Sequence, residues 1–333
     1  MKKVLLASLS VLLVLVLGAA GFVLVARPRV RPASPDKVTV TPERLERGRY
    51  LAENVAICFH CHSQADRALF GTPPKPGTEA AGGMCMSPET GFPGTLCASN
   101  LTSDAETGLG QWTDGEIIRA IREGVSRDGR ALMPIMPSRL YRSMSDEDVQ
   151  ALVAYLRSLP AIRNPLPKTQ LNFPLSVIVR FMPEPLEGPV PAPSPADSVA
   201  QGRYLATVGG CVECHTPVND KHEPLPGMQY AGGQEFELEP GALVRSVNLT
   251  PHQTGLEGLS RGAFIGLFKR HALPEARREV DPRFNTVMGW LSYAGMTEAD
   301  LGAVYDYLQT VPPVDNAVTP WSAPRRVAAP ATP

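Results

Sequence analysis

The sequence has 333 residues, enough for two domains of ordinary size, and its 43% hydrophobic and 20% charged residues are typical of a globular protein rather than a disordered one. Acidic and basic side chains nearly cancel, which leaves a formal net charge of −1. The chain therefore lacks the basic character of a nucleic-acid-binding protein and any strong field that would select a charged partner.

The N-terminal stretch is predicted to meet a membrane. Residues 4–25 carry no charge, and as a helix they would be about 33 Å long, enough to cross the hydrocarbon core of a bilayer. A cleaved signal peptide is the alternative, with a small-residue site near Gly18-Ala19-Ala20, but its apolar core usually runs only ~7–15 residues. We favour an anchor over residues 1–31, and both interpretations export the protein.

A first domain is predicted over residues 41–160. Thr41-Pro42 is a favourable helix start, because an N-cap residue precedes a proline at the first helical position. That helix is expected to continue into the pentapeptide Cys58-Phe59-His60-Cys61-His62. Two further helix starts of the capping-box type are predicted at Thr113–Glu116 and Ser145–Asp148. A Gly- and Pro-rich loop is predicted over residues 71–94.

The pentapeptide has the C-x-x-C-H pattern that attaches a c-type haem. Two thiols three residues apart lie on one side of a helical turn and bond to the porphyrin, which leaves the next imidazole under the iron. A zinc site would need four ligands close together, and a redox dithiol does not need the histidine. The pattern occurs twice, so two haem c groups are predicted, on Cys58, Cys61 and His62 and on Cys211, Cys214 and His215.

The second half of the chain repeats the first. The repeat predicts a second domain over 199–313, a Pro-rich linker over 161–198 and a Pro-rich tail over 314–333. The matching segments are Gly48–Ala52 with Gly202–Ala206, Ala81–Gly83 with Ala231–Gly233, Asn100–Thr102 with Asn248–Thr250, and the last helices, which begin at Ser145 and Thr297.

The repeat also indicates the second axial ligands, which decide between an electron carrier and a catalyst. A shift of 152 residues places Met136 on Met288, both in loops beside Pro or Gly, whereas Met133 falls on Asn285. Met136 and Met288 are therefore predicted to ligate the two irons, although a methionine elsewhere is more often core filling.

Other candidate ligands are less favoured. Met144 and Met296 also match, but they precede helix N-caps, where an apolar residue ordinarily serves as a hydrophobic staple. A bis-histidine second haem, ligated through His252 or His271, stays open as an alternative.

Cys85 and Cys97 have no cysteine counterparts in the second half, where Glu235 and Arg245 occupy the nearest positions. An exported compartment permits them to form a disulfide, which we expect. A thiolate ligand to the first iron is the alternative, and it would have to displace Met136.

The motifs together resemble class I cytochrome c domains. The resemblance is carried by Gly48-x-Tyr50 before C-x-x-C-H, the central Asn-Leu-Thr, the Met loop, and the closing helix with Tyr155-Leu156 or Tyr307-Leu308. The tandem form is similar to the cytochrome subunits of bacterial membrane-bound alcohol, sugar-acid and aldehyde dehydrogenases. This implies an all-α fold of two tandem domains whose first and last helices cross, following an N-terminal transmembrane helix.

The resemblance implies a membrane-tethered di-haem cytochrome that relays electrons by outer-sphere transfer, with no catalytic residues of its own. Its expected partners are a dehydrogenase subunit, a terminal oxidase or a small cytochrome, at the outer, periplasmic side of a bacterial cytoplasmic membrane. No motif for nucleophilic catalysis or phosphate binding competes with this function. The alternative is a di-haem redox enzyme of the peroxidase or thiosulfate-dehydrogenase type, which would need two unlike haem sites.

Overall fold

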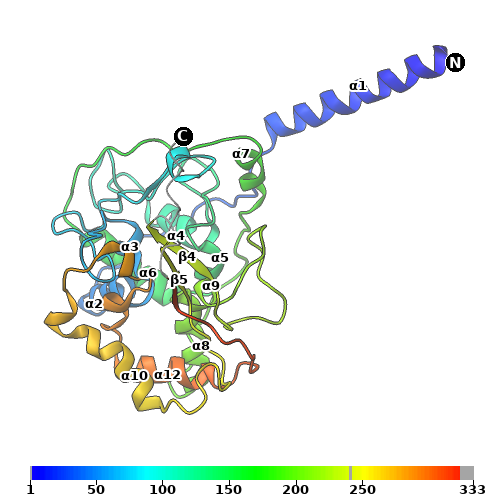
Figure 1. Cartoon of the computed structure of the whole chain (residues 1–333). Coiled ribbons are helices and arrows are strands. Elements are labelled where there is room, and N and C mark those ends of the chain that lie inside the picture. The colour runs from blue at the N-terminus through cyan, green and yellow to red at the C-terminus, as the bar shows by residue number, and fades with distance from the viewer. Residues whose placement is uncertain (1, 240–241, 323–333) are drawn as a thin grey trace, which may run out of the picture.

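A long helix, α1 (Lys2–Val25), projects from the body of the protein in the computed structural model (Figure 1). The structure describes residues 2–239 and 242–322. Among these residues one helix is long and apolar enough to span a membrane, and its window Lys3–Val23 has a mean hydropathy of 2.6 with no part buried. Of the predicted anchor and tail, Met1 and residues 323–333 lie outside the described residues.

The other helices form two sets in the same order, one in each half of the chain. The first set is α2 (Pro42–Tyr50), the π-helix η1 (Leu51–Val55), α3 (Cys58–Cys61), α4 (Asp114–Glu123), α5 (Ser138–Tyr141) and α6 (Asp146–Ser158). The second set is α8 (Ser198–Val208), α9 (Cys211–Cys214), α10 (Arg261–Lys269), α11 (Trp290–Tyr293) and α12 (Glu298–Leu308). Between and within the sets lie α7 (Leu175–Ile178) and the short 3₁₀ helices η2 (Pro88–Thr90), η3 (Val179–Phe181), η4 (Arg270–Ala272), η5 (Pro274–Ala276) and η6 (Pro282–Phe284).

The predicted helix starts are confirmed by their caps. Side-chain oxygens of Thr41, Thr113, Ser145 and Thr297 each accept a hydrogen bond from the backbone N–H three residues later. At α4 the Glu116 carboxylate also accepts from the Thr113 N–H, which completes a capping box.

In each half the first and last helices cross at a glycine. A Cβ on Gly48 of α2 would overlap the carbonyl oxygen of Ala151 in α6, and a Cβ on Gly202 of α8 would overlap that of Ala303 in α12. Glycine is therefore required where these backbones touch. This is the crossing that the resemblance implies.

The fold is helical, as expected, but it is not purely α, because each half also contains a small three-stranded antiparallel sheet. Three of the strands lie in the stretches predicted as loop (71–94), linker (161–198) and tail (314–333), and the other three lie in parts of the two domains for which no strand was predicted. The strands are short, so their alternation of apolar and polar residues is too brief to stand out in the sequence. They are β1 (Cys85–Met86), β2 (Gly94–Cys97) and β3 (Gln170–Leu171), and β4 (Glu235–Glu239), β5 (Ala242–Arg245) and β6 (Trp321–Ser322).

The equivalent hairpins of the two halves are cross-linked at the same position, one by a disulfide and the other by an ion pair. Cys85 and Cys97 are opposite each other in the β1–β2 pair and form a disulfide with an S–S distance of 2.04 Å. Glu235 and Arg245 are opposite each other in the β4–β5 pair and form an ion pair of 2.6 Å. The cysteine pair therefore has a structural counterpart, although not a cysteine one.

The predicted linker is packed against the first half over much of its length. β3 pairs with β2, and the Asp146 N–H at the start of α6 donates to the carbonyl of Val190. The Asn100 amide donates to the Ile162 carbonyl, just as Asn248 donates to that of Val314. The residues that follow each closing helix thus pack against that half of the fold.

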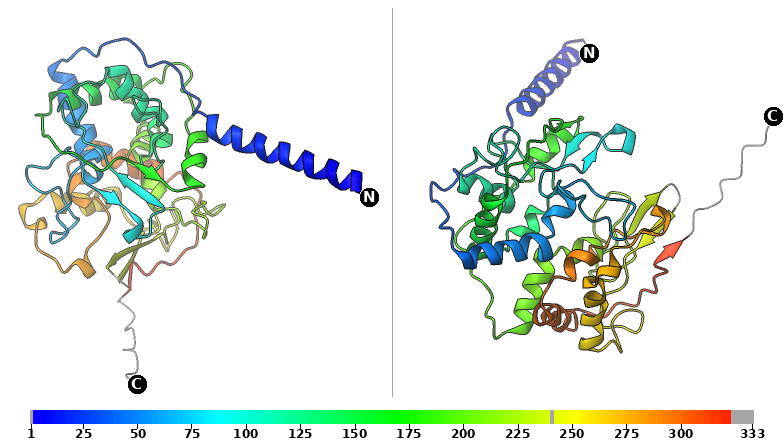
Figure 2. Two further views of the ribbon diagram at one scale, coloured as in Figure 1. Left: turned by 90° about the horizontal axis from the view of Figure 1, so that it is seen from above. Right: turned by 90° about the vertical axis from the view of Figure 1, so that its left-hand side faces the viewer.

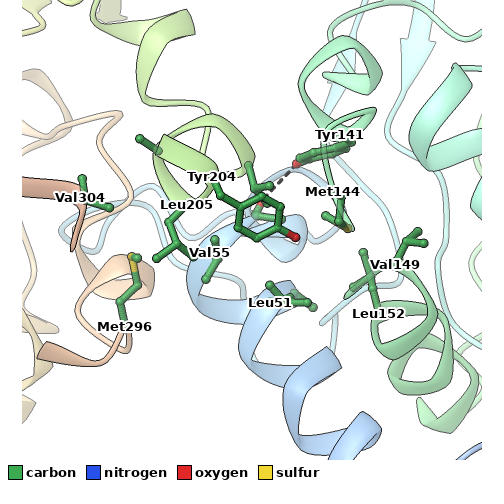
Figure 3. Packing of buried hydrophobic residues seen from close by; sticks show 14 of the residues in the cluster. Leu51, Val55, Tyr141, Met144, Val149, Leu152, Tyr204, Leu205, Met296 and Val304 are labelled. Atoms are coloured by element: carbon green, nitrogen blue, oxygen red, sulfur yellow. Dashed lines mark hydrogen bonds between the residues drawn. The ribbon is translucent and has the colours of Figure 1, made fainter. Parts of the chain in front are cut away.

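The two halves lie against each other, the first blue to green and the second yellow to red in the right-hand view of Figure 2. Their buried side chains form one core cluster. In Figure 3 the Tyr204 ring of α8 lies among Leu51 and Val55 of the first half and Leu205 of the second.

Two tyrosines make the same contact in opposite directions across this interface. The Tyr50 hydroxyl donates to Asp300 (2.5 Å) and accepts from the Thr297 N–H at the start of α12. The Tyr204 hydroxyl donates to Asp148 (2.6 Å) and accepts from the Ser145 N–H at the start of α6. The halves are therefore related by a pseudo-two-fold axis, with the same surface used on both sides.

The disulfide predicts a difference between the two hairpins. Replacing both cysteines (Cys85→Ser with Cys97→Ser) should lower the free energy of unfolding by about 2–3 kcal/mol, because the unfolded chain loses a short closed loop. Breaking the equivalent ion pair with Arg245→Ala should lower it by at most about 1 kcal/mol, since Glu235 is exposed to water. Guanidinium titrations of both variants measure the difference, and equal losses would contradict it.

The tyrosine contacts across the interface lead to a second prediction about stability. Tyr50→Phe and Tyr204→Phe should each lower the free energy of unfolding by about 1–3 kcal/mol, because each leaves the N–H at a helix start without its partner. Tyr305→Phe is the matched control, since the Tyr305 hydroxyl bonds the Leu259 carbonyl within one half.

Circular dichroism in guanidinium gives the readout. In the Tyr50/Tyr204 double variant the two halves should unfold in separate transitions, whereas the control should keep a single one. A single transition in the double variant would show that the hydroxyls do not join the halves.

Candidate functional site

The two C-x-x-C-H motifs fold alike. α3 carries Cys58 and Cys61 and α9 carries Cys211 and Cys214, so each cysteine pair lies on one helical turn, and a histidine follows at the C-cap. The residue before each helix has a left-handed backbone, with φ of 40° at Ile57 and 68° at Gly210. This bend turns the chain from the preceding helix into the motif.

Both motif histidines are oriented by backbone carbonyls. The Nδ1 of His62 lies 2.6 Å from the Ser99 carbonyl oxygen, and that of His215 lies 2.8 Å from the Val247 carbonyl oxygen. Burial lowers the pKa of both rings, and the hydrogen bonds to Ser99 and Val247 oppose that shift only in part. The neutral ring therefore donates through Nδ1 and leaves the Nε2 lone pair for an iron.

The first cysteine of each motif, Cys58 or Cys211, packs against the apolar core. Burial first, and then the charge of the second cysteine in each motif, raise the pKa of Cys58 and of Cys211 to about 12. A redox dithiol or a thiolate ligand needs a lowered pKa, whereas a sulfur bonded to carbon at a porphyrin edge does not ionise and needs none. The motifs therefore fit the attachment of haem c better than dithiol or zinc chemistry.

The two methionine loops share one backbone conformation. The residue after Met136, Pro137, has φ −79° and ψ 53°, and the residue after Met288, Gly289, has φ −72° and ψ 48°. In both loops the methionine carbonyl accepts a 2.7 Å hydrogen bond from the N–H two residues later. Met136 and Met288 are both half-buried. The pair matched by sequence register is thus matched in structure.

A tyrosine ties each methionine loop to the haem motif of its own half. The Tyr141 hydroxyl, at the end of α5, donates to the Ala56 carbonyl (3.2 Å), two residues before Cys58. The Tyr293 hydroxyl, at the end of α11, donates to the Gly209 carbonyl (2.7 Å), two residues before Cys211. Both hydroxyls are buried, which raises their pKa well above the ordinary value, so they remain donors.

The two motifs also lie close to each other across the interface. Burial and the charge of Glu213 raise the pKa of Cys214, and the charge of Cys61, from the other half, adds to this. A Cβ on Gly289 would lie 3.0 Å from the Cδ1 of Ile57, so the second methionine loop packs against the residue before Cys58. The structure therefore brings the two sites side by side.

The other histidines are engaged elsewhere. The Nδ1 of His252 bonds the Thr254 hydroxyl (2.9 Å). His271 stacks on Phe70 and packs against Trp290, with ring centroids 5.3 and 5.0 Å away, and its Nε2 accepts from Arg270. Burial first, and then the neighbouring arginines, lower the pKa of His271. In each ring, one nitrogen is therefore hydrogen-bonded to a residue outside the two motifs.

Several positioning groups were not found by sequence reasoning. Tyr141 and Tyr293 match at the same 152-residue shift as the methionines, so the repeat contained a signal for them. The carbonyls of Ser99 and Val247 have no sequence signal except their positions directly before Asn100 and Asn248, because any residue supplies a backbone carbonyl.

Known proteins resemble the chain over most of its length. The cytochrome c family model matches residues 45–160. A nicotinate dehydrogenase subunit of Pseudomonas putida is 35% identical over 235 residues, which cover 68% of this chain and 19% of that protein. The fructose dehydrogenase cytochrome subunit of Gluconobacter japonicus is 30% identical over 293 residues, 85% of this chain and 56% of that protein.

A third relative is of comparable size. The diheme cytochrome c-type protein of Cereibacter sphaeroides is 30% identical over 224 residues, which cover 66% of this chain and 71% of that protein. The chain spans about a fifth of the nicotinate dehydrogenase subunit and just over half of the fructose dehydrogenase subunit. With a matching family model and a relative covered over more than two thirds of its length, the chain belongs to the cytochrome c family.

Proposed function

We propose that this protein is a membrane-tethered di-haem c-type cytochrome that relays electrons by outer-sphere transfer between a donor enzyme and a terminal acceptor. Its two haem c groups are held by tandem class I domains. Cys58, Cys61 and His62 hold one group, and Cys211, Cys214 and His215 hold the other. Haem c, when bound, supplies a one-electron iron couple whose potential depends on the axial ligands.

One observation carries the proposal: the two sites are built alike. In both halves a backbone carbonyl orients the histidine, and a tyrosine fastens the methionine loop to the motif. An enzyme of the di-haem peroxidase type would need one site that opens to substrate, hence two unlike sites. The matched construction favours a carrier with Met136 and Met288 as the second axial ligands.

The asymmetric features lie away from the ligands. Cys85 and Cys97 bond to each other, so neither sulfur is a thiolate available to an iron. Their hairpin has an ion-paired counterpart in the second half, which indicates a structural role. The cysteine pair therefore gives no support to the enzyme hypothesis.

The named relatives suggest the class of electron donor. Cytochrome subunits of fructose dehydrogenase, quinone alcohol dehydrogenase and gluconate 2-dehydrogenase are all similar to this chain. We infer a dehydrogenase as the donor, and a terminal oxidase or small cytochrome as the acceptor. α1 supports a tether to the bacterial cytoplasmic membrane, with the haem domains on the outer side, where C-x-x-C-H motifs receive haem.

Two methionine substitutions test the proposal. Met136→Ala and Met288→Ala should each convert one low-spin haem into one that binds carbon monoxide. Each should also lower that haem's potential by on the order of 0.1 V or more, since axial ligands set potentials over a range of ~0.8 V. Optical spectra and redox titrations of the two variants measure both effects.

Neighbouring residues provide matched controls. Met133→Ala and Val287→Ala alter the same two loops at positions without a predicted ligand, and both should leave the spectra and the potentials unchanged. If Met136→Ala or Met288→Ala behaved like its control, that methionine would not be a ligand.

A further inference from the structure

An apolar surface lies beside the end of α1, on the segment predicted as linker. We call it the apolar island and define it as Phe173 with α7 and η3, residues 173–181. Phe173, Ile178 and Phe181 are 77%, 48% and 54% exposed. Outside α1, Phe173 is the most exposed large apolar side chain in the described part of the chain.

The island is joined directly to α1. The Phe181 ring stacks on Phe22, with centroids 5.9 Å apart and planes 16° from parallel. Arg180 donates through Nη1 to the carbonyls of Val23 (2.9 Å) and Ala26 (3.4 Å). The Val23 carbonyl belongs to the last turn of α1, where carbonyls lack a partner within the helix, and Ala26 directly follows that turn, so Arg180 caps the helix. Figures 1 and 2 both show α7 beside the base of α1.

The other side of the island is fixed to the body. Val179 is 4% exposed, and the Ser176 N–H donates to the Asn172 carbonyl (2.9 Å), directly after the β3 strand. The Asn172 N–H in turn donates to the Pro93 carbonyl of the first half. Phe173, Ile178 and Phe181 thus face outward from a segment that is held in place.

A bilayer around α1 would reach this surface. α1 buries no part of its apolar window in the body, and Phe181 contacts it at Phe22, one turn before the helix ends. Arg27 and Arg29 follow directly and are exposed, at the level where arginine side chains meet lipid phosphates. Apolar side chains at that depth lie at the boundary between acyl chains and headgroups.

We propose that the apolar island is a second membrane contact, inserted into the headgroup and acyl-chain boundary of the bilayer next to α1. This rests on the proposed membrane tether. The chain between α1 and α2 is also fastened, because Arg31 pairs with the buried Glu123 (2.6 Å) and the Val38 N–H bonds Asp114. Together these contacts hold the haem-binding body at one orientation to the membrane, instead of letting it swing on a tether.

Spin labels on the full-length protein, with haem attached, test the contact. Ile178→Cys carries the label on the island, and Phe173→Cys is a second probe whose side chain is more exposed. Leu273→Cys is the matched control, since Leu273 is 50% exposed and follows α10, which lies on the far side of the body from α1 (Figure 1). Leu12→Cys reports whether α1 itself is inserted.

Each variant is reconstituted in phosphatidylcholine–phosphatidylglycerol vesicles. Power-saturation EPR then compares collisions with oxygen, which concentrates in hydrocarbon, and with a nickel chelate, which stays in water. We expect an oxygen-to-nickel ratio several-fold higher at 178 and 173 than at 273, and highest at 12.

The outcomes separate the two proposals. A label at 12 in hydrocarbon with labels at 178 and 173 as water-accessible as 273 would overturn the island contact and leave the tether intact. Labels at 178 and 173 shielded from both reagents would overturn it in favour of a protein partner. A water-accessible label at 12 would overturn the tether and the island contact together.

Discussion

The reciprocal tyrosine contact is the interaction on which the arrangement of the two halves depends. Tyr50 reaches the start of α12, and Tyr204 reaches the start of α6. Each hydroxyl satisfies a backbone N–H at a helix N-terminus and donates to an aspartate, so the two halves cap each other's closing helix. The same surface is used twice, and across it the second methionine loop packs against the residue before Cys58.

The same repetition governs the chemistry of the sites. Two sites with equal positioning groups suit two irons of the same coordination, and the packing of Gly289 against Ile57 places the two sites side by side, which suits transfer between them. The proposed contacts at the membrane add a fixed orientation of this pair to the plane of the bilayer. A carrier that exchanges electrons with a membrane-bound enzyme would benefit from the closeness of the two sites and from their fixed orientation to the bilayer. Outer-sphere transfer depends on distance and exposure, not on substrate binding.

The sequence was sufficient to predict the features that repeat. Cys58 follows Gly48 by ten residues, but Cys211 follows Gly202 by nine, and the π-helix at Leu51–Val55 absorbs the extra residue. The motifs, the helix caps and the matched methionine loops follow from local patterns. The contacts of Tyr50 and Tyr204 do not follow from local patterns, because a tyrosine on an apolar helix face gives no sign of whether its hydroxyl crosses an interface. The short strands were missed because strands of two to five residues are too brief for their periodicity to be detected.

The most direct test of the proposed relay is a redox titration of the purified protein, followed by optical and EPR spectra of both haems. We predict two low-spin haems, each with a methionine-to-ferric-iron charge-transfer band, and neither reacting with peroxide or carbon monoxide. A high-spin, bis-histidine or ligand-exchanging haem would contradict the relay and indicate an enzyme.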